Sequence, residues 1–351
     1  MASPVGRWGR WVPWVWMAAS GLVACGGESN GDAGSGGAGP GTSGPLAFDP
    51  ANAPTVVAHA SAADRLLALA RDDAFTNQTL GDAAAYSGND ATSPSAPDVM
   101  ASVYFETEGL PTGVGAVRDR RAGVEKDDDA GSALAGRIAL DFTTGFAATD
   151  APNAYGGAAW AARRIARSLD AYLLLVASGG LEERSAAGWD RALGVLFDAE
   201  GGPVGLGRRI AEGDSHCGTQ ALETLRTTLR AVRGPFETAL ETLGKPDALD
   251  RLTIQPGESV EYDAALPTLM TALDAGLASA FVAALDAPEF DGRDQAEAEA
   301  IWSGLSARAR AVDAEVDDAV TVGLGQADSG TIDRAALRAE VLRVFGLDCP
   351  L

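Results

Sequence analysis

Apolar residues recur at helical spacing through most of the second half of the chain. From residue 157 onward they fall three, four or seven positions apart, which places them on one face of a helix. Glycine and proline end several of these runs, as at Gly179-Gly180 and Gly234-Pro235. Strand and helix patterns do not alternate, which argues against a parallel sheet. The strongest run is Leu266, Met270, Leu273, Leu277, Phe281 and Leu285.

These runs predict an all-α bundle of about seven to eight helices. An early helix has Ser61 as its expected N-cap and Asp64 at its third position. The others follow residue 157, and one of them is expected to run unbroken over about 294–322. Residues 73–156 carry Gly, Pro, Asp, Asn, Ser and Thr every few positions and keep no long helical pattern. We therefore expect an irregular acidic loop region near the N-terminus of the body, with a short strand at 103–105.

The first 25 residues have the layout of an export signal. Arg7 and Arg10 precede 14 apolar residues, Trp11 to Ala24, a length that suits a signal peptide and is too short to span a membrane. The stretch ends in Leu22-Val23-Ala24-Cys25, which resembles the lipobox of bacterial lipoproteins. The resemblance implies cleavage before Cys25 and a lipid, such as palmitate, that anchors the protein to the membrane through that residue.

Three segments follow from this resemblance and from composition. Residues 1–24 are expected to be the lipoprotein signal peptide, and residues 25–44 the lipidated Cys with a Gly/Ser-rich tether. Residues 45–351 are the helical domain. Gly26 follows the lipidated Cys where a retention signal for the inner membrane would have Asp, so we expect a bacterial cell envelope protein sorted to the outer membrane.

Composition narrows the possible partners. The chain has a formal charge of −22 with 46% hydrophobic residues, so it has enough apolar material for a core. A strongly acidic surface repels phosphate, and nucleic acid is therefore not an expected partner. Only two His and three Cys occur, which leaves few ligands for a centre built on nitrogen and sulfur. No cofactor is expected, apart from a possible Ca²⁺ ion.

Two cysteines remain after lipidation of Cys25. Cys217 and Cys349 could therefore form one disulfide in the oxidising environment that an exported protein meets. A bond between them would close a loop of 132 residues and tie the end of the chain to the middle of the bundle. The alternative is two independent thiols, with Cys217 buried and Cys349 on a frayed tail.

The chain has two histidines, and each is a candidate for a functional role. His216 lies in Asp214-Ser215-His216-Cys217-Gly218, where a Ser–His or Cys–His pair for nucleophilic work competes with simple capping of the next helix by Asp214 or Ser215. Capping is favoured, because catalytic partners usually come from separate segments. His59 has no second ligand at helical spacing and is expected to be an ordinary, partly buried side chain.

Carboxylates gather in the irregular region. Glu106 and Glu108 are two positions apart and would share one side of a strand, and Asp127 and Asp129 follow. Clustered carboxylates beside glycine suit a hard cation such as Ca²⁺. The spacing does not match an EF-hand loop, however, and a run of acidic residues is usually a solvated surface. Glu106 and Glu108 could also act as general acid and base.

Part of the helical body resembles a known family. Three short segments look like the W-D-x-A helical segments of imelysin-like bacterial surface proteins: Trp160-Ala161-Ala162-Arg163, Gly188-Trp189-Asp190-Arg191-Ala192 and Gly194-Val195-Leu196-Phe197. Those proteins are all-α, lipid-anchored or secreted, and associated with iron uptake. Their G-x-H-x-x-E metal motif does not occur here, so the resemblance implies the fold and no metal or peptidase role.

The sequence leaves more than one function open. We expect a lipid-anchored envelope protein whose helical body binds a small ligand or another envelope protein, and catalysis is not the favoured reading. The competing hypothesis is a lipid-anchored hydrolase or metal-binding protein that uses Glu106, Glu108, Asp127 and Asp129. A mainly structural surface protein is the third.

Overall fold

The structure is all-α over the residues it describes. It is a computed structural model of the whole chain and describes residues 46, 53–70, 106–107, 110–111, 114–123, 158–234, 236, 254, 256–326 and 328–350. All of them belong to one compact unit, Pro40–Leu351. Ten α-helices fall within these residues: α1 (Pro54–Ala70), α4 (Val114–Ala122), α6 (Ala158–Glu183), α7 (Ala186–Gly194), α8 (Gly205–Cys217), α9 (Ala221–Val232), α12 (Val260–Leu285), α13 (Gly292–Val312), α14 (Ala314–Leu324) and α15 (Arg334–Phe345).

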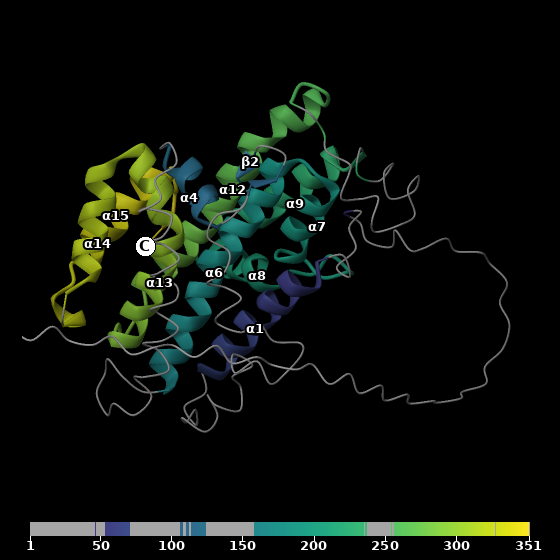
Figure 1. Cartoon of the computed structure of the whole chain (residues 1–351). Helices are drawn as coiled ribbons and strands as arrows, with labels where there is room; N and C mark the ends of the chain where they lie inside the picture. The colour runs from purple at the N-terminus through teal and green to yellow at the C-terminus, as the bar shows by residue number, and fades with distance from the viewer. Residues whose placement is uncertain are drawn as a thin grey trace, which may run out of the picture. The chain divides into compact units, whose positions relative to one another are not determined.

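Two 26-residue helices, α6 and α12, organise the packing. Helix α6 contacts α1, α7, α8, α13 and α4, and α12 contacts α8, α9, α13 and α15. In Figure 1, α13 lies between α6 and the pair α14 and α15, which are drawn in yellow. The sheet within the described residues consists of two antiparallel strands of two residues each, β1 (Glu106–Thr107) and β2 (Leu110–Pro111).

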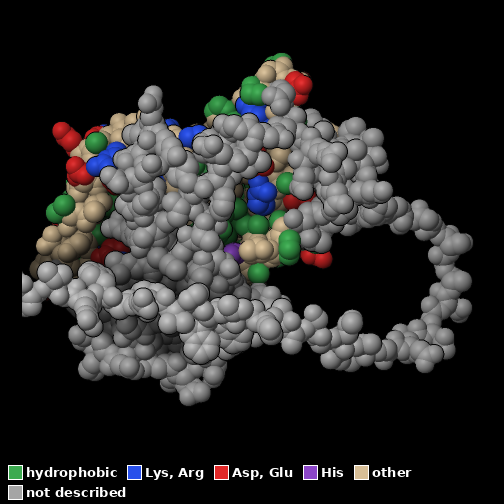
Figure 2. Space-filling model, in the orientation of Figure 1, with side chains coloured by type: hydrophobic (Ala, Val, Ile, Leu, Met, Phe, Trp, Pro, Cys, Tyr) green, Lys and Arg blue, Asp and Glu red, His purple; other side chains and the backbone are tan. Residues whose placement is uncertain are grey.

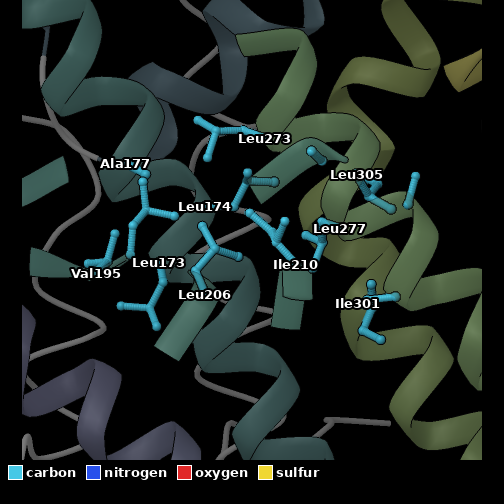
Figure 3. Packing of buried hydrophobic residues seen from close by; sticks show 14 of the residues in the cluster. Leu173, Leu174, Ala177, Val195, Leu206, Ile210, Leu273, Leu277, Ile301 and Leu305 are labelled. Atoms are coloured by element: carbon cyan, nitrogen blue, oxygen red, sulfur yellow. The ribbon is translucent and has the colours of Figure 1, made fainter. Parts of the chain in front are cut away.

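The core lies where α6, α8, α12 and α13 meet. Figure 3 shows their side chains gathered in one apolar interior, with those of α6 and α8 close to those of α12 and α13. Each of these side chains is at most 1% exposed to solvent. The labelled members from these helices are Leu173, Leu174 and Ala177, Leu206 and Ile210, Leu273 and Leu277, and Ile301 and Leu305. This burial is the main source of stability, because apolar surface removed from water stabilises the fold.

Two predicted helix boundaries are wrong. Helix α1 begins at Pro54, where a missing N–H has no consequence, so Ser61 lies inside the helix and does not cap it. Helix α6 continues through Gly179 and Gly180 to Glu183. These glycines permit close packing: a Cβ at Gly179 would lie 2.7 Å from Cγ2 of Val117, and one at Gly180 would overlap the backbone of α7.

The number of helices also differs from the seven to eight predicted. Helices α4 and α8 were not recognised, because one is rich in charge and the other contains three glycines. The helix predicted over 294–322 is two helices, because Asp313 ends α13 and caps α14 by accepting a hydrogen bond from the N–H of Glu315. Helix α4 also lies within the region expected to be irregular. The strand predicted at 103–105 lies outside the described residues.

Within the described part of the chain, one helix is long and apolar enough to cross a membrane. That helix is α12, and 67% of its most apolar stretch is buried inside the unit. Its Asp274 is also buried and forms an ion pair with Arg121 of α4. A mostly buried helix with a paired internal charge is typical of the central helix of a globular unit.

Candidate functional site

Most of the residues predicted to form a site lie outside the described residues. This holds for Cys25, Glu108, Asp127 and Asp129, whereas Glu106 is placed by its backbone in β1. The structure therefore does not test lipidation or the proposed cation site. In the part of the chain that is described, no group of three or more His, Cys, Asp and Glu side chains is arranged to hold a metal ion.

The structure joins Cys217 and Cys349 in a disulfide. Their Cα atoms are 4.3 Å apart and the bond closes a loop of 132 residues. Cys217 is the last residue of α8, which ends at Gly218 in the left-handed conformation that glycine readily adopts. Arg338 of α15 holds the same tail, because it donates hydrogen bonds to the carbonyl oxygens of Cys349 and Pro350 at 2.7 and 3.1 Å.

The segment around His216 serves packing and capping. Asp214 accepts hydrogen bonds from the N–H groups of Ala221 and Leu222 at 3.0 and 2.8 Å, so it does satisfy the first N–H groups of α9. The predicted position is wrong, however, because Asp214 lies in the last turn of α8 and the N-cap of α9 is Gln220. Nε2 of His216 lies 2.9 Å from Oδ2 of Asp286. The sulfur of Cys217 is bonded to Cys349, so a Cys–His pair has no thiolate available here.

His59 is more deeply buried than the sequence suggests. Its side chain is 1% exposed, and its ring lies 5.2 Å from the ring of Tyr172, centroid to centroid. This environment is that of a core side chain.

A network of charged side chains lies inside the bundle, and it is not predicted from the sequence. Its centre is Arg167 of α6, which is 2% exposed. Nη1 of Arg167 donates a hydrogen bond to Oδ2 of Asp170 at 2.9 Å. Its Nε and Nη2 both donate to Oε1 of Glu297 of α13, the Nε bond at 2.9 Å. These contacts and the one to Asp170 fix the guanidinium group in position.

The network extends through Arg209 of α8, also 2% exposed. Its Nε lies 3.6 Å from Oδ2 of Asp170, and it donates to Asp64 of α1 at 2.8 Å and to Glu212 at 2.6 Å. Asp64, expected near the start of a helix, therefore connects α1 to α8, and it also accepts from the N–H of Gly205 at 3.0 Å. We call the whole set the charge network; its members are Asp64, Arg163, Arg167, Asp170, Arg209, Glu212, Asp294 and Glu297.

Burial controls the protonation of this network. It raises the pKa of Asp170 to about 6, although Arg209 and Arg167 oppose the change. Burial also raises the pKa of Asp64, against the N–H of Gly205 and the charge of Arg209. For Arg167, burial alone would lower the pKa, but the attraction of Glu297 and Asp170 is stronger, so its pKa lies above its usual value.

One side of the charge network opens into a cavity of about 340 Å³, which we call the charged cavity. Helices α6, α8 and α13 contribute charged side chains to its wall, and α12 and the residues just after it contribute alanines. At the wall, Arg163 donates to Oδ1 of Asp294 at 2.7 Å and lies 3.8 Å from Oε2 of Glu297. The lining residues are Arg163, Arg167, Glu212, Ala280, Ala283, Ala284, Ala287, Asp294 and Glu297.

A second cavity, of about 410 Å³, lies between the start of α9 and α12. It is lined by hydroxyl and small apolar groups: Thr219, Gln220, Ala221, Thr224, Pro267, Thr268, Thr271, Ala272 and Ala275. No charged side chain lines it among the described residues. The charged cavity is therefore the better candidate site, because a few convergent polar groups beside an apolar wall give a ligand both orientation and burial.

The described lining of the charged cavity consists of Arg, Glu, Asp and Ala side chains. Its carboxylates, from Glu212, Asp294 and Glu297, are groups that can hold a ligand or exchange a proton with it. Its arginines are held by carboxylates and are positioned before any ligand arrives. Figure 2 shows that side chains of both charges also appear on the visible described surface.

A sequence signal for this network exists. Arg163, Arg167 and Asp170 are spaced four and three positions apart on a helix that also carries a strong apolar run. Arginine and aspartate three positions apart on a helix can form an ion pair, but this spacing does not distinguish a buried pair from a solvated one. The partners on α13 could not be assigned from sequence, because their pairing depends on how the two helices pack.

Comparisons with protein families, with curated proteins and with solved structures gave no match. The likeness to imelysin-like proteins therefore stands on its three short segments alone.

Proposed function

We propose that this chain is a lipid-anchored protein of the bacterial cell envelope whose helical body binds a small ligand in the charged cavity. The observation that carries the binding role is the lining of that cavity, in which charged groups are held in place by ion pairs beside an apolar wall. Preorganised polar groups favour binding, because little entropy is lost when the ligand arrives.

Two features support export and anchoring. The lipobox-like Leu22-Val23-Ala24-Cys25 provides the lipid attachment site, and outer-membrane sorting follows from Gly26. The Cys217–Cys349 disulfide suits an oxidising compartment outside the cytoplasm. Multiple acyl chains on Cys25 would hold the body firmly at the membrane, where one chain holds only marginally.

The alternative is a hydrolase or metal-binding protein that uses Glu106, Glu108, Asp127 and Asp129. Nothing in the described residues favours it, and only the backbone of Glu106 is placed. Binding in the charged cavity therefore has the stronger support.

Anchoring is tested by replacing Cys25 with Ser. The C25S chain should lose acyl labelling and leave the membrane fraction, because no sulfur remains to carry the lipid. Radiolabelled fatty acid incorporation and fractionation measure both effects. Ser29→Ala, a similar change four residues further on, serves as the control and should stay labelled. A C25S chain that remains labelled and membrane-bound would contradict the anchoring proposal.

A further inference from the structure

Four polar side chains that line the cavity between the start of α9 and α12 form no hydrogen bond or ion pair with any described residue. They are Gln220, Thr224, Thr268 and Thr271. We call this cavity, of about 410 Å³, the hydroxyl cavity. Its volume lies in the range of small-ligand sites, about 300–1,000 Å³. Side chains that face a cavity and have no internal partner are available to a ligand.

The threonines of the hydroxyl cavity differ from a neighbour on the same helix. A threonine inside a helix can satisfy its hydroxyl group with a carbonyl oxygen one turn earlier. Thr227 of α9 does so, because it donates to the carbonyl oxygen of Glu223 at 2.8 Å. Thr224 lies three positions before Thr227 and makes no such bond within the described part of the chain, and the same is true of Thr268 and Thr271 on α12. The hydroxyl groups at the cavity are therefore not used by their own helices.

The lining has an apolar base and a polar rim. Ala221 and Ala272 are each 5% exposed, so their methyl groups form the base. Thr268 and Thr271 share the face of α12 that carries Ala272, and both are exposed, as is Gln220 before α9. A base of methyl groups below a rim of hydrogen-bonding groups suits a ligand whose surface carries both C–H and O–H groups.

The charges around the hydroxyl cavity favour a neutral ligand. No charged side chain lines it among the residues that the structure places, so neither a cation nor an anion finds a partner there. The start of α9 would attract an anion, but Asp214 accepts hydrogen bonds from the N–H groups of Ala221 and Leu222 at 3.0 and 2.8 Å. Its carboxylate compensates the positive end of the helix dipole and repels a second negative charge.

The walls also argue against a peptide. The lining comes from α9, α12 and the two residues before α9, so no strand edge is present there to pair with a peptide backbone. A partner helix would need an apolar groove, whereas the rim here is polar. Hydroxyl and amide groups both donate and accept hydrogen bonds, which matches the hydroxyl groups of a sugar.

We propose that the hydroxyl cavity binds a small, neutral ligand of the sugar class, with its hydroxyl groups at the four unpaired side chains and its C–H face over Ala221 and Ala272. The hydroxyl cavity and the charged cavity have no lining residue in common. This inference therefore goes beyond the binding role proposed for the charged cavity and does not depend on it.

The test is saturation-transfer NMR titration of the full chain with glucose, maltose and N-acetylglycinamide as separate probes. The detergent must not have a sugar head group, because such a head group would compete for the site. At least one of the two sugars should bind saturably, and N-acetylglycinamide, a neutral amide without hydroxyl groups, should bind more weakly. The dissociation constant should stay the same between about 0.05 and 0.5 M NaCl, because no charge in the lining is available for salt to screen.

Three variants locate the binding. Thr224→Val and Thr268→Val each remove one hydroxyl group and keep the shape of the side chain. Each should weaken sugar binding about two- to tenfold, the usual effect of losing one neutral hydrogen bond. Ala275→Leu should weaken it at least as much, because the larger side chain fills the cavity without changing its charge.

Thr227→Val is the matched control. It makes the same chemical change on the same helix as Thr224→Val, but Thr227 is exposed and does not line the hydroxyl cavity. This variant should bind sugar as the unchanged chain does. Circular dichroism and thermal unfolding of each variant confirm that it is folded.

Four results would overturn the proposal. Two are the failure of both sugars to bind and tighter binding of N-acetylglycinamide than of either sugar. The third is sugar binding that Thr224→Val, Thr268→Val and Ala275→Leu all leave unchanged, since the sugar would then bind elsewhere. The fourth is a dissociation constant that rises steeply with salt, which would show that the ligand is held by charge. Each of these results leaves the binding role of the charged cavity standing, because no variant changes that cavity.

Discussion

Asp170 is a buried carboxylate held between two arginines. Oδ2 is 2.9 Å from Arg167 and 3.6 Å from Arg209, yet burial still raises its pKa to about 6. Two nearby positive charges therefore do not fully offset the loss of hydration. The carboxyl group binds its proton more tightly in the folded chain than in the unfolded chain, where its pKa is near 3.8.

This difference predicts a pH-dependent contribution to stability. The contribution of Asp170 is greatest below about pH 4 and is lost as the pH rises through about 6. The difference between the folded and unfolded pKa values of Asp170 contributes at most about 3 kcal/mol to the free energy of unfolding. Urea unfolding of the wild type and of Asp170→Asn should therefore give a difference, wild type minus variant, that falls over this range.

Asp313→Asn provides a comparison of opposite sign. Its hydrogen bond from Arg343 lowers the pKa of Asp313, so the corresponding difference should rise with pH in the acid range. A wild-type minus Asp170→Asn difference that stays flat or rises with pH would contradict the account. NMR titration of the Asp170 carboxyl in the wild type gives the same information if the variant does not fold.

The charge network shows which part of a site can be predicted from a sequence pattern. The spacing of Arg163, Arg167 and Asp170 is visible in the sequence, but charged positions on a helix are usually solvated. Here Arg167 and Asp170 are buried and Arg163 is half-buried, because α6 is surrounded by other helices; even Ser168 and Asp170 are at most 1% exposed. The packing of helices α1, α8 and α13 around α6 decides this burial, and no local pattern encodes it.

At the scale of elements, α8 and α12 approach closely at glycines. A Cβ at Gly213 would lie 2.5 Å from the backbone N of Ala280 and 2.8 Å from the carbonyl oxygen of Gly276. Gly276 in turn lies against Ile210, which fills the space beside it. Backbone atoms cannot move aside as side chains can, so the contact requires glycine at position 213.

Gly213→Ala should therefore destabilise the fold by about 1–3 kcal/mol, the usual range for overpacking. Chemical denaturation measures the loss. Gly234→Ala is the control, because a Cβ there meets nothing within 4 Å and the change should stay within about 0.5 kcal/mol of wild type. Equal stability of the two variants would show that α8 and α12 are not packed in this way.

The helices that sequence predicts well are those with a sustained apolar run. Helices α6, α12 and α15 all contain the apolar residues that the sequence singles out, although their ends differ from the prediction. Helix α12 begins at Val260, several residues before its apolar run, and the N-cap of α15 is Asp333. Helix α8 was missed because Leu206 and Ile210 are its main apolar residues and Gly205, Gly207 and Gly213 interrupt the pattern. Tertiary contacts stabilise such a helix, so its amino-acid composition alone underestimates its tendency to form.

At the scale of the whole molecule, distant parts of the chain are connected by one covalent bond and one arginine. The Cys217–Cys349 disulfide joins the end of α8 to the tail beyond α15, and Arg338 binds both that tail and Asp286 of the α12 end. A loop of 132 residues gives about 4–5 kcal/mol of stabilisation in the chain-entropy argument, as an upper figure. The sequence could suggest this pair because only two cysteines remain once Cys25 carries lipid.

The most direct test of the central claim, an exported and lipid-anchored helical protein, is mass spectrometry without reductant on the protein extracted from the cell envelope. The account predicts an N-terminal peptide that begins at Cys25 and carries acyl groups, together with a linked peptide pair containing Cys217 and Cys349. An N-terminus that retains residues 1–24 with an unmodified Cys25, or free alkylation of both Cys217 and Cys349, would contradict it.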